Sequence, residues 1–202
     1  LRAAVAVHAD SELIPVTRVN GIVSVLSQPT GGTISGQSVL MNLHGWIPPE
    51  MAVVDPAALH VNFPRGRYRL GGKKETDDQK EALEKITELK QQFQQALKYA
   101  ELSRQADEAN RPGPAPDPHL EALAPYAAGE QLVIIHANNH GDILAAIEFA
   151  EELQLNWVLS DAAEAWKCVD TLKEHGVHVI LGPSMQLPGD DNDPYDAPYS
   201  NP

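Results

Sequence analysis

The residues of this sequence that could do chemistry gather where a short apolar segment ends, in "LVIIHANNHGD" over residues 132–142. Four apolar residues, three of them β-branched, lead directly into His136, and Asn138, His140 and Asp142 follow within six positions. A neutral imidazole at the end of a strand can bind a metal or transfer a proton. It can equally bond to a neighbouring carbonyl, so the residues alone leave both interpretations open.

The polar residues around His136 carry weaker functional signals. His140 lies in the following turn, where it can simply be solvated, and Asp142 is placed to cap a helix that begins at Ile143. At the next strand end, Ser160 or Asp161 can cap a helix, and Glu164 stands where a capping box needs its second residue. We expect this structural role for both acids.

A glycine-rich stretch, "QPTGGTISGQS" over residues 28–38, follows an apolar segment. Its backbone N–H groups, together with the hydroxyls of Thr30, Thr33 and Ser35, could hold a carboxylate or a phosphate. Gly31 and Gly32 could instead be needed only for the backbone angles of a loop. Both interpretations stay open.

Composition and missing motifs exclude several classes of function. The formal net charge is −13, from 15 basic and 28 acidic residues, which argues against nucleic acid and anionic membrane surfaces as partners and suits a small-molecule substrate. The other histidines show no H-x-H or H-E-x-x-H spacing, and no G-x-S-x-G or phosphate-loop pattern occurs. The single cysteine, Cys168, falls inside an expected helix. No apolar run approaches the ~20 residues of a membrane span, and the compartment stays open.

Three strand–helix units must position these residues. "QLVIIHA" leads to "GDILAAIEFAEEL", "LNWVLS" leads to "DAAEAWKCVDTLKEHG", and "VHVILGP" follows. Strands that alternate with helices in this way predict an α/β fold with a parallel sheet, either doubly wound or a (β/α)8 barrel. In both architectures, ligands bind at the carboxyl ends of the strands, where His136 would lie.

The rest of the chain is predicted in less detail. We expect a short helix over 10–20, a strand over 21–28, an apolar segment over 39–46, a mostly irregular stretch over 46–70 with four prolines, a long helix over about 75–110 and a short helix over 119–127. The long helix repeats apolar residues at spacings of three and four, namely Leu83, Ile86, Leu89, Phe93, Leu97 and Ala100. This pattern favours a helix that lies against the outside of the domain.

Taken together, these segments resemble the imidazolonepropionase-related metal-dependent hydrolases of the amidohydrolase superfamily. The resemblance lies in "NGIVSVLSQPTGGTISGQSVLMNLHGW", "LVIIHANNHGDILAAIEFAEEL", "SDAAEAWKCVDTLKEHGVHVILGP" and "DPYDAPYSNP". It implies that residues 1–202 are the central portion of a (β/α)8 TIM-type barrel with an inserted or elongated helix. His136 matches the metal ligand of the fifth strand. The family often has a histidine on the sixth strand, where this chain has Ser160 and Asp161.

The resemblance also implies a function. The expected enzyme hydrolyses C–N bonds, in amides or cyclic amides, with water activated by a divalent metal, expected to be zinc, that His136 binds. Gly31, Gly32, Gln37, Asn138, His140 and Asp161 are candidates to line its substrate pocket, and no catalytic residue is identified. The expected partners are the remainder of the barrel or a second copy, and the isolated chain should be inactive.

Two alternatives remain at this point. The first is a catalytically inactive relative that keeps the barrel as a binding or scaffold module, which the missing sixth-strand histidine favours. The second is an unrelated α/β domain in which His136 is structural and the long helix is a docking surface.

Overall fold

The computed structural model describes residues 1–66 and 77–182. Its strands are β1 (Ser24–Ser27), β2 (Ile34–Asn42), β3 (Ala52–Asn62), β4 (Val133–Ala137), β5 (Trp157–Asp161) and β6 (Val179–Leu181). Its α-helices are α1 (Leu13–Val19), α2 (Pro48–Met51), α3 (Asp77–Glu108), α4 (Pro118–Ala127), α5 (His140–Glu152) and α6 (Val169–Glu174), and two 3-10 helices are η1 (Ala3–Ala6) and η2 (Ala165–Cys168).

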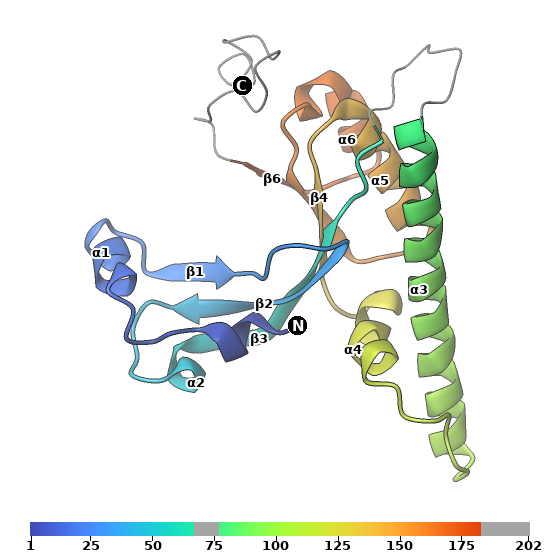
Figure 1. The fold of residues 1–202 in the computed structure, drawn as a ribbon, viewed down its shortest axis with the longest axis horizontal. Helices are drawn as coiled ribbons and strands as arrows, with labels where there is room; N and C mark the ends of the chain where they lie inside the picture. Colours follow the sequence, from blue (N-terminus) through green and yellow to red (C-terminus); the bar gives the residue numbers. More distant parts are fainter. Residues whose placement is uncertain (67–76, 183–202) are drawn as a thin grey trace.

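The strands form one mixed sheet in the order β1-β2-β3-β4-β5-β6. The first three are antiparallel to one another, whereas β3 to β6 run parallel. Figure 1 shows that the sheet curls, with β1 and β2 reaching away from the helices that cover the parallel strands. The shape is that of a half-barrel, and the predicted α/β class with a parallel sheet is confirmed.

Helices cover one face of the parallel strands, and the main hydrophobic core lies between them. Alternate residues of the strands enter it, namely Leu59, Val61, Val133, Ile135, Ala137 and Leu159, and so does Phe63 directly after β3. The intervening residues point to the opposite, inward face, because side chains alternate along a strand. Several of these are polar, namely His60, Asn62, His136 and Ser160, so the inward face carries the groups that could do chemistry.

Helix α3 packs against this core through a narrow stripe and is otherwise solvated. Its buried residues recur at helical spacing: Ala82, Ile86, Leu89, Phe93 and Ala96. Leu83 and Leu97, which the sequence pattern placed on the same face, are 53% and 44% exposed. The long helix is therefore confirmed over 77–108, with a stripe rotated slightly from the predicted one.

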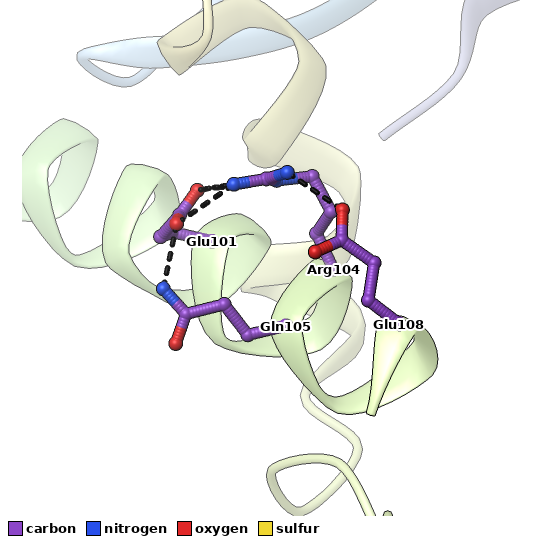
Figure 2. A network of polar contacts seen from close by, with 4 residues as sticks. All are labelled: Glu101, Arg104, Gln105 and Glu108. Atoms are coloured by element: carbon purple, nitrogen blue, oxygen red, sulfur yellow. Dashed lines mark hydrogen bonds and ion pairs between the residues drawn. The ribbon is translucent and has the colours of Figure 1, made fainter. Parts of the chain in front are cut away.

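The far end of α3 carries a local network of ion pairs (Figure 2). Arg104 pairs with Glu101 at 2.9 Å and with Glu108 at 2.7 Å, and the side-chain amide of Gln105 donates to Glu101 at 2.6 Å. All these partners belong to α3 and are exposed, so solvent screens the pairs and they add little to the stability of the helix.

A second, smaller hydrophobic cluster lies under the antiparallel strands. It consists of Ala3 from η1, Val39 and Met41 from β2, and Met51 from α2. Among the described residues, no helix is long and apolar enough to cross a membrane.

Four predictions about local structure are wrong. The stretch over 46–70, predicted as irregular, contains β3, which is the longest strand at 11 residues. The glycine-rich loop over 28–38 is shorter than predicted, because β2 already begins at Ile34. Helix α5 begins at His140 rather than Ile143, and the segment after β5 is divided between η2 and α6.

Candidate functional site

A small cavity lies at the carboxyl ends of β3, β4 and β5, where a parallel sheet places ligands. Its volume is about 100 Å³, and it is lined by Asn62, Phe63, Arg65, His136, Ala137, Asn138, Asp142 and Asp161. The parallel register explains this gathering: Asn62 pairs with His136, and Ala137 pairs with Asp161.

His136 and Asp161 form the central contact of this cavity. The Nδ1 of His136 lies 2.8 Å from Oδ2 of Asp161, and the His136 side chain is 13% exposed. Asp161 ends β5 with a positive φ of 71°, and Ala162 follows with a φ of 46°. Backbone in this region is strained for residues other than glycine. The strained turn therefore holds the carboxylate beside the imidazole, and Asp161 does not cap the next helix as predicted.

His60 stands behind His136 on the same face of the sheet. Its Nδ1 is 2.9 Å from Nε2 of His136, and the two rings stack with centroids 5.3 Å apart. His60 is only 1% exposed, and its Nε2 is a buried atom without a hydrogen-bond partner in the described part of the chain. Burial, and then the neighbouring His136, lower the pKa of His60 to about 4, so its ring is neutral near pH 7.

When both rings are neutral, these contacts assign the positions of the protons. The Asp161 carboxylate accepts, so the Nδ1 of His136 must donate, and the Nε2 of a neutral His136 then carries a lone pair. That lone pair accepts from the Nδ1–H of His60. The opposite order would turn a ring lone pair towards the carboxylate and leave a buried N–H of His60 unpaired. Asp161, His136 and His60 therefore form one ordered hydrogen-bond chain.

Asp142 is a buried carboxylate that links two segments of the cavity wall through hydrogen bonds. It is 1% exposed and accepts from the backbone N–H of Gly66 and from Nδ2 of Asn139, both at 3.1 Å. Burial raises the pKa of the Asp142 carboxyl, against the opposing effect of these hydrogen bonds. Asp142 thus joins the segment after β3 to the first turn of α5, and it is not the residue before the helix.

Of the next two predicted pocket residues, Asn138 and His140, only Asn138 lines the cavity. Asn138 lines the cavity, and its Oδ1 accepts from the Ala163 N–H at 3.4 Å. His140 is not among the lining residues, and its backbone N–H donates to the Glu164 carboxylate at 2.7 Å. Glu164 therefore holds the start of α5 rather than completing a capping box.

The glycine loop reaches the cavity only indirectly, and Gln37 does not reach it. The carbonyl of Gly32 accepts from Nδ2 of Asn62 at 2.7 Å, and Gly31 precedes it in the same turn. Gln37 lies within β2, and its side chain extends towards the carbonyl of Ala122 on α4, 3.5 Å away. None of the three lines the cavity.

Sequence reasoning missed His60, Asn62 and Arg65. A signal was present in "ALHVNF", where apolar Leu59, Val61 and Phe63 alternate with polar residues as in a half-buried strand. The prolines on either side of this segment argued against a strand, so the alternation of apolar and polar residues was not interpreted as one.

The described residues hold only part of a metal site. Asp161 orients the His136 ring, and a carboxylate on one ring nitrogen is the usual support for a histidine whose other nitrogen binds a metal. In this structure that other nitrogen, Nε2, accepts from His60. Among residues 1–66 and 77–182, however, no group of three or more His, Cys, Asp or Glu side chains could hold an ion. His136 therefore fits a metal as one ligand, and further ligands would have to come from elsewhere.

The fold has a solved counterpart. An amidohydrolase from Thermotoga maritima MSB8 matches this structure with a TM-score of 0.79, over 95% of this chain and 50% of that chain, with 21% of residues identical. No family model and no curated protein sequence matches the chain. The chain thus shares the fold of half of that protein, and this likeness concerns the fold alone.

Replacing Asp142 by alanine is expected to lower the free energy of unfolding by about 2 kcal/mol, because the buried N–H of Gly66 loses its acceptor. Asp142→Asn keeps an acceptor and removes a buried charge, so its effect should stay within about 1 kcal/mol. Urea unfolding followed by circular dichroism measures both. Asp170→Ala, an exposed acid in the first turn of α6, is the control. Equal losses for the alanine and asparagine variants would contradict this role.

Proposed function

We propose that the protein is, or belongs to, a metal-dependent hydrolase of C–N bonds in amides or cyclic amides, with His136 as a ligand of a divalent metal, zinc being the expected ion. The observation that carries this proposal is the 2.8 Å contact between Nδ1 of His136 and the Asp161 carboxylate at the strand end, because it assigns the proton of a neutral His136 to Nδ1. The shared fold with an amidohydrolase supports it.

We further propose that the six strands are part of a (β/α)8 barrel, with residues 1–202 as its central portion and α3 as an elaboration between β3 and β4. The curled sheet and its helix-covered face support this. The chain spans half the length of the amidohydrolase it matches. The remaining metal ligands would then come from strands outside the described residues, and kinship with imidazolonepropionases within the superfamily stays a proposal.

A bound divalent metal supplies a water of lowered pKa and polarises the scissile carbonyl. The chain's own residues have narrower roles. Asp161 holds the His136 ring in the tautomer that leaves Nε2 free of a proton. Phe63 and Ala137 form the apolar part of a cavity lining that is otherwise polar. Arg65 is exposed and adds a positive charge to a cavity lining that also contains the carboxylates of Asp142 and Asp161.

Two amide side chains support the substrate class. Asn62 and Asn138 both line the cavity. In the described part of the chain, Asn62 is engaged through Nδ2 and Asn138 through Oδ1, which leaves one acceptor and one donor respectively. An amide substrate presents the complementary pair, an N–H and a carbonyl.

Elemental mass spectrometry of the purified protein and of its His136→Ala variant tests the proposal. We expect the variant to lose about one metal equivalent, because one protein ligand of a catalytic site is removed. His140→Ala, four positions further on, should keep the metal, since His140 does not line the cavity. A protein without metal, or a His136→Ala variant that retains it, would favour the catalytically inactive module instead.

A further inference from the structure

The sheet has an open edge at β1, which the proposed function does not use. Within residues 1–66 and 77–182, β1 pairs only with β2, so no strand lies on its other side. The N–H of Leu43 donates to the carbonyl of Val23 at 2.8 Å, and this bond sets the alternation along the antiparallel pair. The backbone N–H and C=O groups of Ser24 and Leu26 therefore point away from β2.

Helix α1 adds an apolar face beside this open edge. The helix has seven residues and none of them is buried, and it exposes Leu13, Val16 and Val19, the last at 87%. Arg18 donates to the carbonyl of Leu43 at 3.2 Å, so α1 adjoins the beginning of β1 (Figure 1). Short helices are stabilised mainly by packing an apolar face, which indicates that α1 has a partner here.

Three more apolar residues extend this face. Val23 just before β1, Leu26 within it, and Trp46 between β2 and α2 are exposed, Trp46 at 85%. Together with the three residues of α1 they form what we term the β1 surface. At roughly 100 Å² for each exposed apolar side chain, the six residues offer about 600 Å², so two such surfaces would bury about 1,200 Å², the lower end of the range for stable interfaces.

The charge pattern indicates what covers the β1 surface. The chain has 28 acidic and 15 basic residues, yet Arg18 is the only charged residue between Leu13 and Pro49. A basic partner would be attracted to the acidic residues elsewhere rather than to this segment. Two copies of an acidic chain, in contrast, repel each other least where neither copy presents acidic side chains. The charge distribution therefore favours a second copy of this chain.

We propose that the β1 surface joins two copies of this chain into a symmetric dimer, in which β1 of one copy pairs antiparallel with β1 of the other. In a two-fold arrangement centred on Val25, Ser24 of each copy lies opposite Leu26 of the other. The outward N–H and C=O groups of these residues then bond to each other, as in other cases of strand addition at a sheet edge. The dimer does not depend on whether His136 binds a metal.

Sedimentation equilibrium over about 1–100 μM protein tests the proposal, because an interface of this size is expected to have a Kd in the micromolar range. Leu26→Pro removes an N–H that points away from β2, so the pairing between copies loses a donor while the pairing within each copy is kept. Val19→Lys places a charge on the exposed face of α1. We expect each variant to raise the Kd about tenfold or more.

Two matched variants serve as controls. Leu26→Val keeps the N–H and an apolar side chain. Leu83→Lys places the same charge on an exposed leucine of α3, away from the β1 surface. Both should change the Kd by less than about twofold, and circular dichroism checks that every variant is folded.

Amide hydrogen exchange measures the pairing on the unaltered protein and does not depend on whether a variant folds. Raising the protein concentration from well below the Kd to well above it should slow the exchange of the Ser24 and Leu26 N–H groups about tenfold. The N–H of Val25 faces β2 and should exchange at the same rate throughout.

Each other result overturns the proposal. A chain that stays monomeric at the highest concentration has no such dimer, and binding of a different protein to the β1 surface of a monomeric chain would identify another partner. A dimer that Leu26→Pro and Val19→Lys leave intact, or that Leu83→Lys weakens equally, is formed by another surface. Exchange at Ser24 and Leu26 that is independent of concentration would exclude the strand pairing.

Discussion

Phe93→Ala is expected to lower the free energy of unfolding by about 3–5 kcal/mol, among the largest effects of any single truncation in this chain. Phe93 is 1% exposed in the buried stripe of α3, and its ring meets the edge of Phe149 of α5 with centroids 5.8 Å apart. Phe149 contacts Phe63, which lines the cavity, in the same way at 5.7 Å. Removing the Phe93 ring leaves a cavity where α3 joins the core. Urea unfolding followed by circular dichroism measures the loss.

Leu97→Ala is the matched control for this prediction. Leu97 lies one turn further along α3 but is 44% exposed, so its truncation should cost about 0.5 kcal/mol or less. Similar losses for the two variants would mean that α3 is not seated by its buried stripe. That outcome would revive the interpretation of α3 as a docking surface that is separate from the core.

The centre of the site could be predicted because its residues obey simple rules. The apolar segment before His136 forms β4, and the histidine falls at the strand's carboxyl end, as a parallel sheet requires. The contact between His136 and Asp161 depends on the register between β4 and β5, in which Ala137 lies opposite Asp161. The sequence alone does not give this register. His136 could therefore be placed at the site from the chain alone. Asp161 was predicted both to cap a helix and, through the family resemblance, to line the pocket; it lines the cavity, but its contact with His136 was not predicted.

The antiparallel half was harder, for a physical reason. Prolines usually exclude a strand, but Pro56 lies where the register of β2 and β3 shifts between Ser38 and Leu40, so its missing N–H interrupts little. Gln37 shows the reverse error. It was predicted in a loop near the strand ends. In the structure it lies inside β2, opposite Leu59 of β3, and its side chain does not reach the cavity.

Acidification from pH 6.5 to about pH 4 is expected to cost about 3 kcal/mol of stability through His60 alone. The pKa of His60 is lowered from 6.5 to about 4, first by burial and then by His136. The unfolded chain therefore binds a proton at a higher pH than the folded one. The stability that neutral His60 contributes is complete above pH 6.5. It is lost as the pH falls towards 4, because each pH unit between the pKa of the unfolded chain and that of the folded chain corresponds to about 1.4 kcal/mol.

Urea unfolding of the chelator-treated protein at several pH values measures this loss. His60→Asn cannot take up the proton, so its stability should fall about 3 kcal/mol less than that of the unaltered protein over the same range. Asp142, whose pKa is raised by burial, contributes with the opposite sign in both proteins and cancels in the difference. His119→Asn removes an exposed imidazole. It tests whether the loss of any histidine reduces the dependence of the unfolding free energy on pH. Parallel curves for the unaltered protein and His60→Asn would mean that folding does not lower the pKa of His60, and its ring would then be charged in the folded protein between pH 6.5 and 4.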